Sequence, residues 1–472
     1  MKFVFGTDGW RDIIADGFTF ENVRVVSQAV CDYHRARNLS PRIALGYDTR
    51  FLSDLFAENV ALVAAGNGIQ VTMSHSFVPT PALAYETYSG GYDGGIMITA
   101  SHNPPQYNGF KVKASFGGSA PPETVDGISR ILEDNLGRKR GHEMLRREEA
   151  QERGLLRRHN MVEKYRQHLV SLVDTERICA TSPRVCADPM YGAAQGFLGS
   201  LLEEVGCRVE EINSEQNPIF GGVNPEPIAK NLSKLRSRVL AGGFDLGIAV
   251  DGDGDRVGAI DERGNFVNSH QIFALLLRQL VKNKGLDGSV VRTISTTSLI
   301  DLMAEAYGKK VLVTPVGFKY VAQHILKGGV LMGGEESGGI WVQGHIPERD
   351  GALMGCLLAE LISYEGRGLG ELLDDLRKEY GEFLYWRGDV EVDEGRKREI
   401  QKELSFFDPG PRLGEKVKEI SRIDGLKYIF QDHSWLMIRP SGTEHVVRIY
   451  AEASSEERLK NLMEVGLDFV RG

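Results

Sequence analysis

The feature that most constrains the fold is a pattern that recurs three times along the 472 residues. Each copy has an apolar run typical of a strand, a polar turn, an amphipathic helical stretch, a glycine and a second strand-like run. The copies cover residues 42–71, 184–209 and 290–311. This order is that of a βαβ unit, in which a helix connects two parallel strands. The pattern therefore predicts three related α/β domains.

Chain length and a change of pattern near the C-terminus indicate a further unit. A single hydrophobic core stops growing near ~250–300 residues, so a chain of 472 residues should form several domains. Beyond residue 375 or so, helix-flanked strands replace the βαβ pattern, which indicates an α+β domain. We expect the four domains to cover residues 1–155, 156–258, 259–372 and 373–472.

Composition narrows the class of protein. The hydrophobic content of 42% and charged content of 26% are those of a soluble globular protein. No apolar run approaches the ~18 residues of a membrane span, and the first residues leave no room for a signal-peptide core. The five cysteines form no Cys-x-x-Cys pair. We therefore expect reduced thiols in a cytoplasmic protein that has no membrane partner.

The net charge of −9 bears on possible partners. Nucleic-acid binding would require a basic face, so we expect no nucleic-acid partner. An anionic substrate would have to be attracted by a local positive cleft, because the overall charge repels it. The oligomeric state is expected to be monomer or homodimer.

A serine follows an apolar strand-like run in the first domain. Residues 96–98 (Ile-Met-Ile) are typical of a buried strand, and Asn103 and Pro104 favour a turn. Ser101 is thus expected at the carboxyl end of a strand, where open parallel sheets bind ligands. The alternative is a serine that only satisfies an amide of the turn.

Three aspartates follow a second apolar run, residues 244–250. Asp251, Asp253 and Asp255 alternate with glycines, so their carboxylates can converge on one hard cation such as Mg²⁺ or Ca²⁺. An EF-hand calcium loop is disfavoured, because the position that needs glycine is Arg256. A purely structural acidic turn is also disfavoured, since clustered carboxylates repel one another unless a cation neutralises them.

A third candidate loop lies between two strand-like runs of the C-terminal domain. Hydroxyls, a glycine amide and two arginines suit a phosphate group, which accepts many hydrogen bonds and pairs with guanidinium groups. Taken alone, the same residues are also compatible with an ordinary turn. The residues concerned are Arg439, Ser441, Gly442, Thr443 and Arg448.

Together these segments resemble the α-D-phosphohexomutase family, which includes phosphoglucomutases and phosphomannomutases, over nearly the whole chain and in the family's order. The matching segments are Gly6–Arg11 (N-terminal signature), Thr99–Pro104 (phosphoserine loop), Asp251–Arg256 (metal loop), Gly334–Gly338 (sugar-binding loop) and Arg439–Thr443 (phosphate-binding loop). The resemblance implies an α/β fold, with three related mixed-sheet α/β/α domains plus a C-terminal α+β domain around a central cleft.

The resemblance also implies a reaction. Ser101 would carry a phosphoryl group, donate it to one oxygen of a hexose phosphate and recover it from another, with a hexose 1,6-bisphosphate as intermediate. Mg²⁺ would be held by Ser101 with Asp251, Asp253 and Asp255, and would neutralise the phosphoryl charge. Glucose 1,6-bisphosphate would act as activator. No Gly-x-Ser-x-Gly elbow surrounds the candidate serines, which excludes that class of hydrolase.

Further site residues are matched by their positions in the family motifs. Lys111 corresponds to a lysine proposed for general acid/base work, with an exposed strand lysine as the alternative. His102 is either an active-site contact or a structural residue. The remaining matched residues are Arg11 and Arg256 beside the phosphoserine, Lys319 as a substrate-orienting lysine, and Glu335 and Ser337 in the sugar-binding loop.

One position departs from part of the family. Members with broad or mannose-leaning specificity often carry histidine where this chain has Gly339, whereas His345 follows six residues later. This spacing looks more like the glucose-type phosphoglucomutases, and it raises the possibility that His345 substitutes for the missing histidine. We therefore favour glucose phosphate over mannose phosphate or dual specificity. The rival classes are a magnesium-dependent phosphatase, which would want an aspartate in place of Ser101, and a non-catalytic sugar-phosphate sensor.

Overall fold

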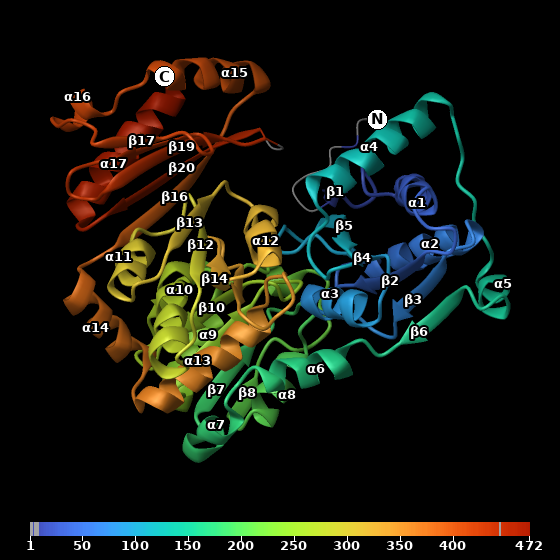
Figure 1. Ribbon diagram of the computed structural model, residues 1–472, viewed down its shortest axis with the longest axis horizontal. Coiled ribbons are helices and arrows are strands. Elements are labelled where there is room, and N and C mark those ends of the chain that lie inside the picture. Colours follow the sequence, from blue (N-terminus) through green and yellow to red (C-terminus); the bar gives the residue numbers. More distant parts are fainter. Residues whose placement is uncertain (1–2, 4–8, 443–444) are drawn as a thin grey trace.

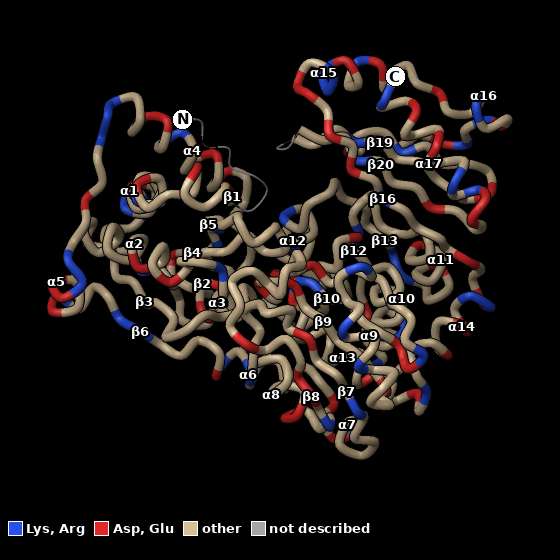
Figure 2. The backbone as a smooth tube through the Cα atoms, turned by 180° about the vertical axis from the view of Figure 1, so that it is seen from behind, with Lys and Arg blue, Asp and Glu red and all other residues tan. Residues whose placement is uncertain are grey.

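The computed structural model describes residue 3, residues 9–442 and residues 445–472, which form four sheets surrounded by helices. The N-terminal unit and the C-terminal unit lie on opposite sides of the molecule, and the second and third units lie between them (Figure 1). Acidic and basic residues are interspersed over all four units (Figure 2). The expected α/β architecture with mixed sheets is confirmed.

The first three sheets are mixed. The first contains β1 (Gly9–Ile13), β2 (Arg42–Tyr47), β3 (Gln70–Ser74), β4 (Gly94–Ile98), β5 (Tyr107–Ala114) and β6 (Leu156–His159), in the order β1-β5-β4-β2-β3-β6. The second contains β7 (Arg184–Asp188), β8 (Arg208–Glu211), β9 (Leu246–Val250), β10 (Val257–Ile260) and β11 (Phe266–Val267), in the order β11-β10-β9-β7-β8. The third contains β12 (Ser289–Thr293), β13 (Val311–Thr314), β14 (Val330–Gly334) and β15 (Ile340–Val342), in the order β13-β12-β14-β15.

Helices surround these sheets. Those of the first unit are α1 (Phe20–Arg35), α2 (Ser53–Gly66), α3 (Thr80–Ser89), α4 (Pro122–Gly137) and α5 (Arg147–Glu152). The second unit has α6 (Val162–Ser171), α7 (Thr175–Thr181), α8 (Phe197–Glu204) and α9 (Ser233–Gly242), with short 3₁₀ turns at Phe220–Gly222 and Ala229–Asn231. The third has α10 (Ser269–Arg278), continued by a π-helical turn at Gln279–Asn283, then α11 (Leu299–Ala306), α12 (Phe318–Lys327), α13 (Gly351–Glu365) and α14 (Leu369–Tyr380).

One arrangement of four strands is repeated in the first three sheets. Strands β2–β5 of the first sheet correspond in order to β7–β10 of the second and β12–β15 of the third. In each set the first strand is parallel to the second and third, whereas the fourth is antiparallel to the third. The three predicted βαβ units are therefore confirmed, with α2, α8 and α11 as their connecting helices.

Three loops occupy the same place in this repeated arrangement. Each connects the third strand of a set to its antiparallel neighbour, at residues 99–106, 251–256 and 335–339. The carboxyl ends of parallel strands are where α/β sheets bind ligands. The repeat thus places the serine loop, the three-aspartate loop and the sugar-binding loop at equivalent ends of three sheets.

The fourth unit is built differently. Its sheet is wholly antiparallel, with β16 (Leu384–Glu391), β17 (Glu419–Ser421), β18 (Leu426–Ile429), β19 (Trp435–Pro440) and β20 (Val446–Ala453) in the order β16-β20-β19-β18-β17. Its helices are α15 (Glu394–Glu403), with a 3₁₀ turn at Leu404–Phe406, α16 (Gly410–Leu413) and α17 (Glu456–Arg471). None of the helices in the described part of the chain is long and apolar enough to cross a membrane.

The sheets do not end where the predicted domains do. Strand β6 pairs with β3 in the first sheet, although it follows the predicted limit at residue 155. Strands β10 and β11 pair within the second sheet, although the limit at residue 258 falls inside β10. Helix α13 packs on the second unit as well as the third, and one hydrophobic core joins both units. The four domain limits stay predictions, and the strand pairing places two of them inside or beside a sheet.

Candidate active site

Ser101 lies immediately after β4 with an unusual backbone conformation. Its φ is 54°, in the left-handed region that non-glycine residues rarely adopt, and the residue is 1% exposed. Its amide donates to Thr99 Oγ1 at 2.9 Å, and its hydroxyl donates to Asp251 Oδ2 at 2.7 Å. Such strain persists only where surrounding contacts enforce it, and it is most frequent at functional sites. The structure thus fixes the serine hydroxyl against the three-aspartate loop.

A buried arginine holds the serine loop in place. Arg50 is 3% exposed, and its Nε lies 3.2 Å from Asp48 Oδ2, which also accepts from Thr99 Oγ1 at 2.6 Å. The guanidinium group donates to the carbonyl oxygens of Ser101 (2.7 Å), Asn103 (2.6 Å), Pro104 (2.8 Å) and Tyr107 (3.0 Å). Sequence reasoning missed both Asp48 and Arg50. The available signal was their place just after β2, at the same edge of the sheet as Ser101.

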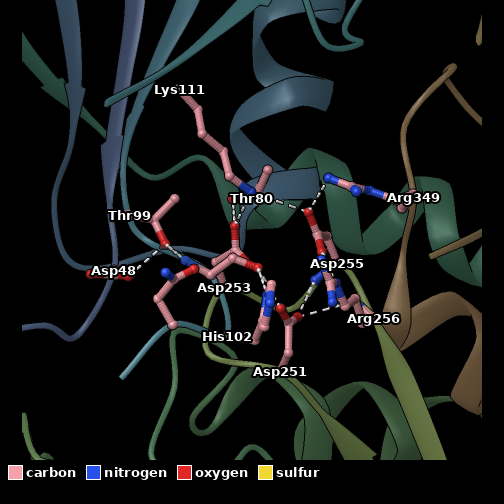
Figure 3. Close-up of polar contacts among 12 residues, drawn as sticks. Asp48, Thr80, Thr99, His102, Lys111, Asp251, Asp253, Asp255, Arg256 and Arg349 are labelled. Atoms are coloured by element: carbon pink, nitrogen blue, oxygen red, sulfur yellow. Dashed lines mark hydrogen bonds and ion pairs between the residues drawn. The ribbon is translucent and has the colours of Figure 1, made fainter. Parts of the chain in front are cut away.

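The three aspartates converge as predicted. Asp251, Asp253 and Asp255 are fully buried, and each offers a carboxylate oxygen within 4.8 Å of the others (Figure 3). The loop curls because Asp251 Oδ1 accepts from the amides of Asp255 and Arg256, at 2.9 and 3.1 Å. A Cβ on Gly252 would lie 2.5 Å from the Ser101 carbonyl oxygen. Glycine at this position therefore permits the close approach of the two loops.

The donor set fits a divalent cation with oxygen ligands. Asp253 Oδ1 and Asp255 Oδ1 are buried and accept no hydrogen bond from any described residue. Buried carboxylate oxygens normally have a partner, so two such atoms in one cluster indicate a ligand site. Oxygen donors of this kind suit Mg²⁺.

Electrostatics supports the same interpretation. Burial, together with the charges of Asp253 and Asp255, raises the pKa of Asp251 well above its usual range. Burial acts in the same direction on Asp253, but Lys111 and the Thr80 hydroxyl outweigh it and hold its pKa well below the usual range. A bound cation would relieve the repulsion among these carboxylates.

Lys111 lies on β5 and is 1% exposed. Its Nζ is 2.7 Å from Asp253 Oδ2 and 3.3 Å from Asp255 Oδ2, and Thr80 Oγ1 donates to the same Asp253 oxygen at 2.6 Å (Figure 3). An exposed strand lysine, the alternative considered from the sequence, is wrong. The acid/base role of Lys111 stays a prediction.

Arg349 is a site residue that sequence reasoning missed. Its Nη2 lies 2.6 Å from Asp255 Oδ2 and its Nη1 lies 3.3 Å from Glu335 Oε2. Burial, opposed by the Arg349 charge, raises the pKa of Glu335 to about 7. A Cβ on Gly339 would lie 2.2 Å from Arg349 Cδ. The arginine therefore occupies the space that a side chain at position 339 would need.

His345 lies in a buried cluster of polar side chains. Its side chain has no exposed surface, its Nε2 lies 3.2 Å from Asp350 Oδ2, and its Nδ1 lies 3.1 Å from His168 Nε2. Asp350 also accepts from the Tyr165 hydroxyl at 2.6 Å and caps α13. Both ring nitrogens face protein groups, so the residue belongs to a buried packing cluster. That His345 replaces a histidine at position 339 stays a prediction.

Three further predicted residues, Arg11, His102 and Arg256, lie at the serine loop and the three-aspartate loop. Arg11 Nη1 donates to Asn103 Oδ1 at 2.8 Å, and His102 Nδ1 lies 3.4 Å from Ser101 Oγ. Burial and the charges of Arg256 and Arg11 lower the pKa of His102 well below its usual range. The imidazole is therefore neutral, and the positive charge beside the serine comes from the arginines. Gly6, Thr7 and Asp8 of the N-terminal signature lie outside the described residues.

The substrate-binding residues predicted for the third unit lie on two elements. Lys319 lies in the first turn of α12, with its Nζ 5.3 Å from the centre of the Tyr320 ring. Glu335 is buried beside Arg349, and Ser337 is half-buried in the same loop. The structure thus brings Glu335 to the three-aspartate loop through Arg349, whereas Lys319 makes no ion pair with that loop among the residues that the structure describes.

Two arginines of the phosphate-binding loop pair across adjacent strands. Arg439 of β19 and Arg448 of β20 are register partners, and Ser441 is buried beside them. Thr443 lies outside the described residues, and Gly442 is exposed. Arg439 Nε lies 2.8 Å from Asp424 Oδ2, and Arg448 Nε lies 3.4 Å from Asp389 Oδ2. Each of the two arginines therefore has a carboxylate partner in the same unit, and the phosphate-binding role of this loop stays a prediction.

A third arginine, missed in the sequence, lies on the same face of this sheet. Arg387 of β16 pairs with Asp389 at 2.9 and 2.8 Å, and its Nη1 is 3.7 Å from Glu336 Oε1 in the sugar-binding loop. Its side chain is 33% exposed. Arg387 therefore links the third and fourth units beside the predicted phosphate site.

Comparison with known proteins decides which family has this arrangement. Four segments match the domains of the phosphoglucomutase/phosphomannomutase family: α/β/α domain I at residues 2–138, domain II at 163–264, domain III at 268–380 and the C-terminal domain at 390–465. The chain belongs to the phosphoglucomutase/phosphomannomutase family. Each matched domain carries one of the four loops described above, and the family supports hexose-phosphate mutase activity, an isomerase reaction, for this member.

Individual family members extend over the whole chain. A phosphoglucomutase/phosphomannomutase of Thermococcus kodakarensis is 33% identical, covering 99% of this chain and 98% of its own. A protein of Methanopyrus kandleri named a probable phosphoglucosamine mutase is 33% identical, covering 99% and 97%. A crystal structure from Thermus thermophilus, described as a phosphomannomutase candidate, has 32% identity and a TM-score of 0.86, covering 100% and 99%. These names differ in the sugar, so similarity supports the reaction class without selecting the substrate.

Proposed function

We propose that this protein interconverts glucose 1-phosphate and glucose 6-phosphate through a phosphorylated Ser101 and glucose 1,6-bisphosphate. The observation that carries the proposal is the serine hydroxyl held 2.7 Å from Asp251, inside a buried loop of three converging carboxylates. A non-catalytic sensor would need the sugar and phosphate contacts, but it would need neither a strained serine nor an acidic loop directed at it. A phosphatase would share the acidic loop but not the serine.

The proposed transfer is balanced at the serine oxygen. The bond between phosphorus and Ser101 Oγ breaks while the free sugar hydroxyl forms a new bond to phosphorus, and the hydroxyl proton passes to a base. Glucose 1,6-bisphosphate then turns round, and its other phosphoryl group returns to Ser101 as the proton is given back. No water enters the reaction, which fits the burial of Ser101.

Lys111 is our candidate for the proton transfer. Its neighbours Asp253 and Asp255 favour the charged ammonium, whereas the nearby Arg349 charge favours the neutral amine. Mg²⁺ bound by Asp251, Asp253, Asp255 and the serine phosphate would neutralise charge on the transferring group. The cation would also offset the negative charge of the carboxylates beside Lys111. Less free energy would then be needed to remove the proton from the lysine.

The fourth unit would hold the phosphate that does not react. Removing one charge-assisted contact typically costs ~1.5–3 kcal/mol, or about ten- to a hundredfold in binding. Arg439→Ala should therefore raise KM for the sugar monophosphate by about that factor. The value of kcat should also fall, because the contact with the non-reacting phosphate orients the reacting hydroxyl. Steady-state kinetics checks this result. Arg398→Ala, on the exposed face of α15, is the matched control.

A second measurement separates substrate binding from folding in this variant. Phosphorylation of Ser101 by a small phosphoryl donor without a second phosphate should be nearly unchanged in Arg439→Ala. Equal loss of this reaction and of mutase activity would show that Arg439 supports the fold through its contact with Asp424 rather than holding the substrate.

A direct assay tests the proposed function and its substrate. The protein is incubated with Mg²⁺ and with glucose 1-phosphate, mannose 1-phosphate or glucosamine 1-phosphate, each with a catalytic amount of the matching 1,6-bisphosphate. We expect isomerisation to the 6-phosphate, with the highest kcat/KM for glucose. Higher kcat/KM for glucosamine would favour the activity named in the Methanopyrus kandleri relative. Release of inorganic phosphate would indicate a phosphatase, and no reaction would indicate a sensor.

A further inference from the structure

A second buried lysine lies on β5, two residues beyond Lys111. Residues i and i+2 of a strand point to the same face, so Lys111 and Lys113 are directed to the same side of the sheet. Each is 1% exposed. Lys111 contacts Asp253 and Asp255 of the second unit, whereas Lys113 Nζ donates to Glu348 Oε2 in the segment that follows β15. One strand of the first unit therefore makes charged contacts with both neighbouring units.

Glu348 connects this lysine to the active site. The carboxylate is fully buried, and its Oε1 accepts from the Arg349 amide at 3.2 Å and lies 3.7 Å from Arg349 Nε. Arg349 in turn reaches Asp255 at 2.6 Å and Glu335 at 3.3 Å. The contacts form a closed ring that begins and ends on β5. In order, its members are Lys113, Glu348, Arg349, Asp255 and Lys111.

The backbone around this ring leaves little room for adjustment. A Cβ on Gly118 would lie 2.6 Å from the Pro347 carbonyl oxygen, and a Cβ on Gly117 would lie 3.3 Å from Ile346 Cδ1. The turn after β5 is therefore in direct contact with the residues just before Glu348.

Stability alone does not explain a fully buried ion pair. The loss of hydration of both ions can exceed their mutual attraction, and apolar replacements of the whole pair are often neutral or stabilising. A buried ion pair of this kind is better explained if it fixes the position of the groups around it. Its position here is between the serine-bearing sheet and the arginine that contacts both the three-aspartate loop and the sugar-binding loop.

We propose that Lys113 and Glu348 are positioning residues of the mutase site. They hold the Arg349 guanidinium on Asp255 and Glu335, and thereby set the place of the sugar-binding loop relative to Ser101. Neither residue touches the substrate. The inference rests on the proposed function for its kinetic consequence, but the positional claim concerns the folded protein alone.

The test uses the full-length double variant Lys113→Met/Glu348→Gln, which removes both charges and keeps the side-chain lengths. We expect its melting temperature to stay within a few degrees of wild type. Its kcat should fall about 10- to 100-fold, as a small misplacement of catalytic groups implies. KM for the sugar monophosphate should change by less than about threefold, because the phosphate contacts of the fourth unit are untouched. A wild-type kcat would overturn the proposal.

Hydrogen exchange supplies a readout that does not depend on turnover. The peptide covering residues 335–350 should exchange faster in the double variant, because Arg349 loses the charge of Glu348 and is held by Asp255 and Glu335 alone among the described residues. Unchanged exchange would overturn the positional claim, even if the wild-type protein had no mutase activity. The matched control is Lys284→Met/Glu360→Gln, a second ion pair with a separation of 2.7 Å, in which Glu360 is fully buried and Lys284 is half-buried, away from the site. It should alter neither kcat nor exchange in residues 335–350. If the double variant does not fold, Glu348→Gln alone carries the same kinetic and exchange test.

Discussion

Ser101→Ala should abolish phosphoryl transfer. The variant lacks the only oxygen at this position that can form the phosphoester, so turnover should fall by at least about 10⁴-fold, as losing a covalent nucleophile implies. After incubation with glucose 1,6-bisphosphate, intact-protein mass spectrometry should show one added phosphoryl group on the wild type and none on the variant. Because Ser101 is 1% exposed and small, alanine should leave the fold intact.

The matched control is Ser129→Ala, which removes a hydroxyl of α4 that donates to the Val125 carbonyl oxygen of its own helix. This variant should be labelled like the wild type. Equal labelling of Ser101→Ala would show that another residue carries the phosphate. Peptide mapping of the labelled wild type would then identify that residue.

Asp253→Asn should give the second large effect. The substitution keeps the size of the side chain but removes one of three charges that converge on the proposed cation. It also takes from Lys111 its charged partner at 2.7 Å. Metal affinity and kcat should each fall by at least about 100-fold, as the loss of a charge-neutralising ligand implies. Isothermal titration calorimetry with Mg²⁺ measures the affinity, and the isomerisation assay with glucose 1-phosphate measures kcat.

Chelation complements this substitution. Removing divalent cations from the wild type should abolish activity while far-ultraviolet circular dichroism stays unchanged, and added Mg²⁺ should restore turnover. Asp287→Asn, an exposed aspartate paired with Lys309, is the charge-matched control and should keep both metal binding and activity. Near-native activity of Asp253→Asn in chelator would mean that the three-aspartate loop is not a metal site.

Much of the architecture could be predicted because its signals are local. A strand, a turn, a helix and a glycine succeed one another within about thirty residues in a βαβ unit, and the three predicted units are present. The serine and aspartate loops were predicted for the same reason. Ser101 follows an apolar run directly, and Asp251, Asp253 and Asp255 are spaced by single glycines, so neighbouring residues alone make their convergence possible.

Residues that act across units could not be predicted in this way. Arg50 holds the serine loop by bonds to four carbonyl oxygens more than fifty residues away. Arg349 reaches Asp255 across a separation of 94 residues. Their roles depend on which sheets face each other, and no local pattern records that. His345 is the opposite case, because its motif predicts a substrate contact while the fold directs its ring to His168 and Asp350.

The sequence by itself determined the repeated βαβ units, the strand-end serine and the acidic loop, since periodicity and residue spacing control backbone geometry over short distances. Only the tertiary structure decided that β4, β9 and β14 end at equivalent places, so that their loops meet. It also decided that Lys111, Arg349 and the Lys113–Glu348 pair surround the carboxylates. The physical reason is that burial and charge pairing belong to the packed interfaces between units, where desolvation makes each ion depend on partners that are distant in the chain.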